Sequence, residues 1–192
     1  MTASSGNASI GGHSIVLFGE RVALRPHDED SMRSLRRWYA DPELTRLSRH
    51  RQRPVGDDEF DEVIARKIGS AEMLAFAIHE RIEGAAEQLV GGCAFAALDR
   101  ENGSASFHIA IGEPGARGRG IGRAATQLAA DFAFDGLGLH RLSLSVFSFN
   151  TAAIRCYQGA GFREEGRARE AIIRDGRRWD EIQMGLLASD RT

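Results

Sequence analysis

Apolar and polar side chains alternate along several stretches of the chain, as in β-strands that bury one face. The clearest case has Phe107, Ile109 and Ile111 at every second position. Similar alternation, bounded by glycine-containing turns, recurs along the rest of the sequence. Strands are therefore predicted over residues 15–26 (a strand pair, or one strand bent around Gly19), 74–80, 88–98, 104–112, 140–149, 163–173 and 177–187.

Other stretches have apolar residues three or four positions apart, which is the spacing of a helix with one buried face. Met32, Leu35 and Trp38 follow this spacing after an acid-rich start, which predicts a helix over residues 28–40. Further helices are predicted over residues 57–68, from residue 121 onward, and over 150–160. The order of the elements predicts a mixed α/β sheet.

Composition narrows the class of protein further. An apolar fraction of 42% can support a full core, and the length favours one domain. Residues 1–14 are small, polar and rich in glycine, which predicts a disordered tail. A net charge of −2 gives no reason to expect nucleic-acid or membrane binding through bulk charge. No apolar run reaches the roughly 20 residues of a membrane span. Two cysteines form no disulfide framework, so a reduced, cytoplasmic setting is expected. The scattered histidines predict no metal site.

A glycine-rich turn joins the strand at 104–112 to the helix that follows it. Gly118, Gly120 and Gly122 remove side chains where the backbone enters this helix. Free N–H groups at a helix N-terminus bind anions, and phosphate above all. Arg117 and Arg119 add positive charge there, with Arg123 one turn on. The turn therefore predicts a pyrophosphate-binding site, although a plain glycine turn with solvated arginines remains an alternative.

Two known patterns fit this turn. Residues 120–125 match the G-x-G-x-x-A fingerprint of dinucleotide-binding folds, which expects an acid about 20 residues later, at the end of the next strand. That strand ends near Ser145–Ser148, where no acid occurs. Residues 117–122, Arg-Gly-Arg-Gly-Ile-Gly, instead resemble the acetyl-CoA loop of the GNAT N-acetyltransferases.

A second motif supports the GNAT resemblance. The segment from Asn150 to Phe162 resembles the family pattern Asn-x-x-Ala-x-x-x-Tyr-x-x-x-Gly-Phe, about 30 residues after the loop. The resemblance covers residues 15–189 and is greatest to the branch of ribosomal-protein-alanine and spermidine N-acetyltransferases. It implies a mostly antiparallel sheet of six to seven strands, flanked by helices and splayed between strands 4 and 5. It also implies an acyl-CoA-dependent N-acetyltransferase that uses acetyl-CoA, without a metal, on a primary amine in a direct transfer.

The same resemblance assigns roles to individual residues. Backbone groups of the fourth strand, at Ile109, Ala110 and Ile111, would bind the pantetheine arm and polarise the carbonyl. The cofactor-binding loop would be Arg117, Gly118, Arg119, Gly120, Ile121 and Gly122. Tyr157 would be the general acid that protonates the leaving thiolate, with a buried core tyrosine as the alternative. Asn150 would bind the CoA arm or an ordered water, or cap the helix that follows it.

The general base does not follow the family pattern. Many members have a glutamate where this chain has Ser106, and serine is a poor base. His108 lies two residues on, hence on the same side of the strand, and titrates in a useful range. A structural histidine, Glu43, Glu113, a water relay or an amine that arrives neutral are alternatives. Glu43 and Ser106 are assigned to acceptor binding.

Three further questions remain open from the sequence. The basic run Arg46, Arg49, His50, Arg51 and Arg53 would meet the adenosine phosphate of CoA, meet an acidic acceptor, or form a solvated loop. A closing hairpin over residues 163–187, with Trp179, Ile182 and Met184 as apolar surface, predicts a homodimer. A non-catalytic CoA-binding module is the alternative to an enzyme; the phenol at Tyr157 favours catalysis.

Overall fold

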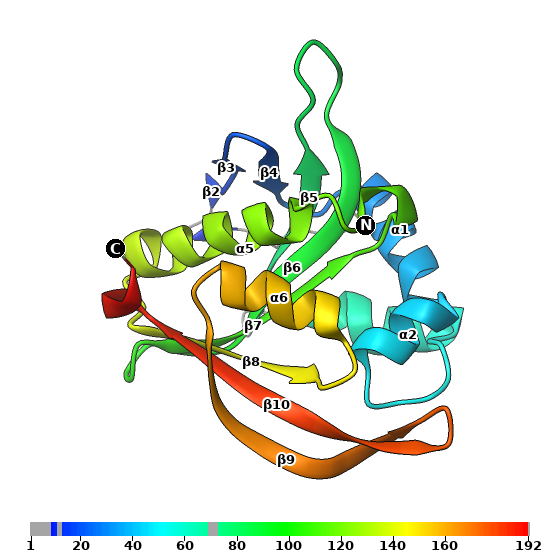
Figure 1. Cartoon of the computed structure of the whole chain (residues 1–192). Coiled ribbons are helices and arrows are strands. Elements are labelled where there is room, and N and C mark those ends of the chain that lie inside the picture. Colours follow the sequence, from blue (N-terminus) through cyan, green and yellow to red (C-terminus); the bar gives the residue numbers. More distant parts are fainter. Residues whose placement is uncertain (1–8, 11–12, 69–72, 192) are drawn as a thin grey trace.

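The computed structural model describes residues 9–10, 13–68 and 73–191 (Figure 1). A small antiparallel ladder, β1 (Ser9–Ile10) and β2 (His13–Ser14), lies within the range predicted as a disordered tail. The other residues of this range, 1–8 and 11–12, lie outside the described ranges, so a disordered tail stays a prediction for them. The main sheet contains β3 (Leu17–Phe18), β4 (Val22–Arg25), β5 (Met73–Glu80), β6 (Gln88–Asp99), β7 (Ser104–Ile111), β8 (Arg141–Phe147), β9 (Arg163–Arg174) and β10 (Arg177–Leu187).

This eight-stranded sheet has the order β3-β4-β5-β6-β7-β8-β10-β9, and every neighbouring pair is antiparallel except β7 and β8. The resemblance predicted six to seven strands; the sheet has eight, and its first stretch forms two of them because Gly19 turns the chain, with its N–H 2.8 Å from the Val22 carbonyl oxygen. The predicted splay between strands 4 and 5 is confirmed at β7 and β8. These strands pair only from Ser104↔Arg141 to Ser106↔Ser143, and their backbones then separate (Figure 1). We call this separation of the two backbones the β7–β8 notch.

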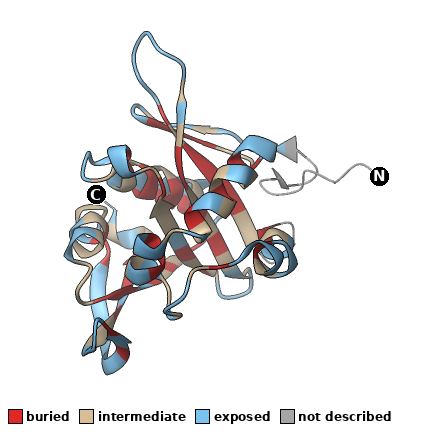
Figure 2. Ribbon diagram, turned by 90° about the vertical axis from the view of Figure 1, so that its right-hand side faces the viewer, coloured by how far each residue is buried: buried red, intermediate tan, exposed pale blue. Residues whose placement is uncertain are grey.

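Two apolar clusters cover opposite faces of the sheet, because successive strand residues point to opposite sides. On β6, Cys93 and Phe95 pack toward α5 (Ile121–Asp131) and α6 (Thr151–Gly159), which lie in front of the sheet in Figure 1. Leu89 and Ala94 pack toward the other layer. That layer contains α1 (Glu29–Tyr39), α2 (Pro42–Ser48), α3 (Asp57–Glu59), the π-helical segment η1 (Phe60–Ala65) and α4 (Arg66–Ile68). Figure 2 shows the buried residues gathered between the layers.

Most predicted helices occur where the periodicity placed them, with one addition. Asp28 caps α1 by accepting the Ser31 N–H at 2.8 Å. The sequence predicted no helix between residues 40 and 57, whereas the chain starts α2 at Pro42. Asp41 caps α2 by accepting the Glu43 N–H at 2.8 Å, and proline suits the first helical position. A further π-helical segment, η3 (Phe132–Gly136), follows α5, and two 3-10 turns, η2 (Pro114–Ala116) and η4 (Ala188–Asp190), complete the fold.

The closing hairpin is confirmed as β9 and β10, with Asp175 and Gly176 both at positive φ in its turn. The surface assigned to it is wrong, however. Ile182 and Met184 are 4% and 1% exposed, because they point toward α5 and α6 and belong to the main core. They therefore cannot form an exposed apolar surface for a second subunit.

Candidate functional site

The glycine-rich turn presents a run of free backbone donors. Gly118 and Gly120 adopt left-handed φ values of 72° and 83°, and Gly120 is the N-cap of α5. Within the described part of the chain, the N–H groups from Gly118 to Arg123 donate to no protein acceptor, and intrahelical bonding starts at Ala124 N–H to Gly120 O. Successive unpaired amides at a helix N-terminus form an anion-binding site. This is the geometry that the phosphate site predicted from the sequence requires.

Arg117 and Arg119 support the turn rather than extend freely from it. Arg117 donates to the carbonyl oxygens of Ile111 at 3.0 Å and Gly112 at 2.9 Å, and pairs with Glu43 at 3.1 Å. Arg119 forms a bidentate pair with Glu80, whose side chain is only 5% exposed. Each guanidinium is thus already balanced by a carboxylate. The attraction for an anion comes mainly from the amides and from other cations.

Arg21 is such a cation, and sequence analysis missed it. Its guanidinium donates to the Arg119 carbonyl oxygen at 3.0 Å and lies 3.1 Å from the place where a Cβ on Gly120 would be. Arg123, exposed on the first turn of α5, is a second. In the described ranges neither arginine pairs with a carboxylate. Since Arg21 precedes the turn by about a hundred residues, only the folded sheet shows that it belongs to the site.

The notch exposes backbone groups of β7. The Gly112 N–H donates to the Val90 carbonyl oxygen at 2.9 Å, which places residue 112 and every second residue before it in hydrogen-bonded register with β6. Ile109 and Ile111 therefore direct their N–H and C=O groups toward β8, which has moved away. Ala110 directs its own groups to β6. The Ile111 carbonyl oxygen already accepts a hydrogen bond from Arg117. The groups that remain free to face the notch are the N–H groups of Ile109 and Ile111 and the carbonyl of Ile109.

A bulge ends β7 at this point. The N–H groups of Gly112 and Glu113 both approach the Val90 oxygen, at 2.9 and 3.1 Å, an arrangement typical of β-bulges. A Cβ on Gly112 would lie 2.0 Å from the Trp38 ring, so only glycine fits between β7 and α1. The bulge strengthens the local twist and helps to turn β7 away from β8.

Tyr157 lies on α6, within the main core. It is 9% exposed and its ring is 6.0 Å from that of Phe162. Burial raises the pKa of the phenol well above its usual value, with a smaller contribution from Cys156. The phenol thus stays protonated at neutral pH, as a proton donor requires. Its hydroxyl makes no hydrogen bond to any other described residue. Cys156 faces α5, where its Sγ lies 3.5 Å from the place that a Cβ on Gly122 would take, and burial raises the pKa of its thiol.

Asn150 has a structural role in this fold. Its side-chain oxygen caps α6 by accepting the Ala153 N–H at 3.2 Å, and its amide nitrogen donates to the Leu47 carbonyl oxygen at 3.2 Å. The cap was one of the two roles considered for it. The link to Leu47 was not foreseen, and it attaches the start of α6 to the end of α2.

Ser106 and His108 lie on the opposite face of β7 from the core. Ala105 and Phe107 are buried under α5 and α6, whereas the His108 side chain is exposed on the face of α1 and α2. The histidine is therefore not a buried structural residue. Although its surface is accessible, the ring lies against the sheet closely enough that partial desolvation lowers its pKa, so it is neutral at neutral pH and can accept a proton. Ser106 is paired in register with Ser143 of β8.

Glu43 and Glu113, the two glutamates considered as general bases, differ in how free their carboxylates are to contact a substrate. The Glu43 side chain is 66% exposed and contacts the glycine turn through Arg117. Glu113 accepts a hydrogen bond from the Trp38 indole N–H at 3.1 Å and pairs with Arg37. Glu113 is thus committed to holding α1 against the end of β7.

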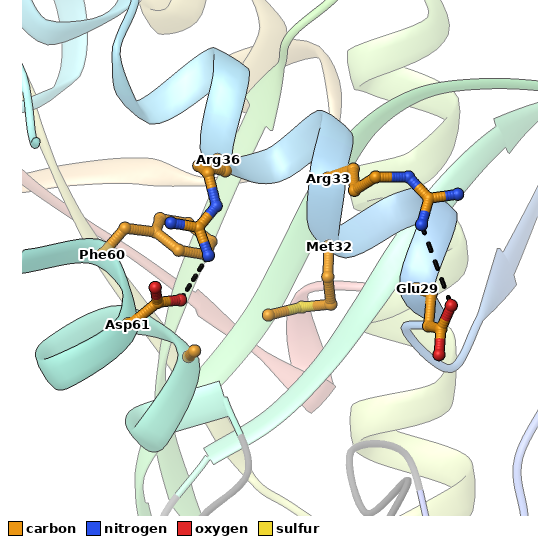
Figure 3. A pocket seen from close by; sticks show the side chains of 7 residues that line it. Glu29, Met32, Arg33, Arg36, Phe60 and Asp61 are labelled. Atoms are coloured by element: carbon orange, nitrogen blue, oxygen red, sulfur yellow. Dashed lines mark hydrogen bonds and ion pairs between the residues drawn. The ribbon is translucent and has the colours of Figure 1, made fainter. Parts of the chain in front are cut away.

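Two hollows lie outside the notch. One, of about 270 Å³, lies between α1 and η1, where Met32 and Phe60 form its apolar floor (Figure 3). Ion pairs from Arg36 to Asp61 and from Arg33 to Glu29 line it. The other, of about 250 Å³, is lined by Arg49, His50, Arg51, Val55, Glu59 and Ile64. Among the described residues no group of three or more His, Cys, Asp or Glu side chains gathers as a metal site.

Comparison with known proteins agrees with this geometry. A model of the acetyltransferase (GNAT) domain matches residues 21–163. The chain is 27% identical to the uncharacterized N-acetyltransferase p20 of Bacillus licheniformis over 89% of this chain and 95% of that protein. It is 31% identical to spermidine N(1)-acetyltransferase of Vibrio cholerae over 69% of this chain and 73% of that protein. The crystal structure of Vibrio cholerae spermidine N-acetyltransferase in complex with CoA and spermine matches with a TM-score of 0.78 and 25% identity, covering 90% of this chain and 98% of that one. None of the helices in the described ranges has the length and hydrophobicity needed to cross a membrane.

Proposed function

This chain belongs to the GNAT acetyltransferase family and is an acyl-CoA-dependent N-acetyltransferase, and we propose that it transfers the acetyl group directly to an amine bound beside the β7–β8 notch. The observation that carries the proposal is the continuity of two sets of free backbone groups. The amides from Gly118 to Arg123 are unpaired and available to an anion, and the N–H groups of Ile109 and Ile111 face the notch that precedes this turn in the chain. Together they suit a pyrophosphate and the arm attached to it.

Each residue then has a distinct task. Gly118, Gly120, Ile121 and Gly122 hold the pyrophosphate through their amides, assisted by Arg21. The Ile109 N–H stabilises the negative charge that develops on the carbonyl oxygen, which is typically a large contribution to catalysis. The amine nitrogen attacks the carbonyl carbon and the C–S bond breaks. His108 accepts the proton that the amine loses, and Tyr157 donates a proton to the leaving thiolate.

The acid and the base act from opposite sides of the notch in this proposal. Tyr157 lies in the layer of α5 and α6, whereas His108 lies on the face of α1 and α2. The amine therefore approaches from the α1–α2 side, where Glu43 and Ser106 also lie. Spermidine, on which the named Vibrio cholerae relatives act, is one acceptor to test. Release of the CoA thiol on addition of a primary amine tests the function.

The pH dependence of the rate tests His108. Because desolvation lowers the pKa of this ring, we expect the rate to fall only as the pH drops below the ordinary histidine range, where the ring becomes charged and cannot accept a proton. His108→Gln should remove this acidic limb and lower kcat by about ten- to a hundredfold. His140→Gln, at an exposed histidine just before β8, should change neither. An unchanged rate and pH profile in His108→Gln would exclude the histidine as base.

A further inference from the structure

The basic segment after α2 contains an arginine whose charge is not balanced. The Arg49 guanidinium lies 3.5 Å above the centre of the Tyr39 ring and pairs with no carboxylate in the described ranges. Its Nε is buried and donates to no acceptor. A buried donor without a partner costs free energy unless a ligand or water satisfies it. The Nε–H of Arg49 is therefore a donor that a ligand with a hydrogen-bond acceptor could satisfy.

The neighbouring groups add to this excess of positive charge. Arg51 and Arg53 share one carboxylate, that of Glu59. The Nη1 of Arg51 is buried and, like the Nε of Arg49, has no acceptor. Two guanidinium groups, those of Arg49 and Arg51, thus line the hollow of about 250 Å³ described above together with one carboxylate, that of Glu59. We call this hollow the Arg49 pocket. Such a pocket favours an anion with several acceptor oxygens.

The backbone that carries these arginines is held in place. Arg174 of β9, only 4% exposed, donates to the carbonyl oxygens of Arg49 and Arg51, the latter at 3.1 Å. Its guanidinium also lies 5.5 Å from the ring centre of Phe147. The unpaired donors therefore belong to a segment tied to the closing hairpin and to the end of β8, not to a free loop.

His50 connects the Arg49 pocket to the acceptor side of the notch. Its ring meets Phe147, the last residue of β8, edge-on at 5.3 Å, and its Nε2 lies 3.1 Å from Glu181. Val55 and Ile64 of the pocket belong to the α1–α2 layer, the side on which His108 is exposed. The pyrophosphate amides instead start α5, in the opposite layer.

From this arrangement we infer that the acceptor is an amine whose molecule also carries an anionic group, a carboxylate or a phosphate, and that the Arg49 pocket binds that group. The inference rests on the proposed function and specifies its substrate class. It separates this chain from relatives that act on spermidine, which carries no anionic group.

Matched acceptor pairs test the inference. Thiol release from acetyl-CoA is measured with 3-aminopropanoate, 4-aminobutanoate, 6-aminohexanoate and O-phosphoethanolamine, each against the neutral amine of the same chain length. We expect at least one anionic member to have a KM at least about tenfold below that of its neutral partner. Arg49→Met, which keeps a linear side chain over Tyr39, should abolish this preference and leave the KM of acetyl-CoA unchanged. Arg53→Met, at a side chain that is 73% exposed, should keep it.

The outcomes separate the inference from the proposed function. A wild-type enzyme that uses neutral and anionic partners equally, or a preference that survives Arg49→Met, overturns the inference and leaves the function intact. A third outcome also overturns the inference and leaves the function intact. If Arg49→Met raises the KM of acetyl-CoA but not that of 3′-dephospho-acetyl-CoA, the pocket binds the 3′-phosphate of CoA. No thiol release with any amine, spermidine included, contradicts the function itself. Circular dichroism confirms that each variant is folded.

Discussion

Tyr157→Phe is expected to lower kcat by about ten- to a thousandfold while leaving the affinity for CoA nearly unchanged. The substitution removes one hydroxyl from a ring that otherwise packs against Phe162. Burial holds the pKa of this phenol high, so the wild-type side chain is protonated when the thiolate leaves. Without it, the leaving sulfur takes its proton from water. Steady-state thiol release gives kcat, and calorimetric titration gives the CoA affinity.

Tyr39, the other tyrosine in the chain, provides the control. Its ring packs edge-on against Phe60 at 5.5 Å and lies under Arg49, so Tyr39→Phe keeps its ring contacts. We expect its kcat to stay within about twofold of the wild type. Full kcat in Tyr157→Phe would remove the tyrosine from the mechanism and leave solvent as the proton source.

Gly118→Asp should weaken CoA binding by at least about tenfold. A Cβ at Gly118 meets no atom within 4 Å, so the side chain fits, and aspartate tolerates the left-handed φ of 72° better than most residues. The added carboxylate would stand among amides that we assign to the pyrophosphate, where repulsion between like charges is large. Calorimetric titration with CoA measures the loss.

Gly118→Asn separates the effect of the added negative charge on CoA binding from the effect of the added side-chain volume. Asparagine has the size of aspartate and the same tolerance of positive φ, so both variants carry the same backbone cost. We expect the asparagine variant to bind CoA markedly more tightly than the aspartate variant, by about tenfold. Equal affinities would mean that no negative charge of the ligand lies beside Gly118.

Local pattern was enough to predict most of the fold. The alternation at Phe107, Ile109 and Ile111 follows from a strand with one face under α5, and it predicted β7 correctly. The positive φ at Asp175 and Gly176 is the turn that this residue pair favours. α2 was missed because it is short, begins at a proline and buries only Leu44 and Thr45, so it has almost no periodicity to detect.

The candidate site was less predictable, because its geometry depends on contacts between distant segments. The sequence shows that Arg117 and Arg119 flank the turn, but not that Glu43 and Glu80 neutralise them. It does not show that β4 and β5 bring Arg21 against Gly120. Alternation identifies the apolar face of β7, but it does not show which helices cover that face or that His108 faces the α1–α2 layer.

Initial-velocity kinetics with both substrates varied tests direct transfer most directly. Acetyl-CoA is varied at several fixed concentrations of an amine that releases thiol. Direct attack of the amine on the thioester, with both held at the β7–β8 notch, predicts double-reciprocal lines that intersect, because both substrates must be bound before any product leaves. Parallel lines would contradict the account, since they indicate that CoA departs before the amine binds and that an acetyl group passes through a covalent intermediate on the protein.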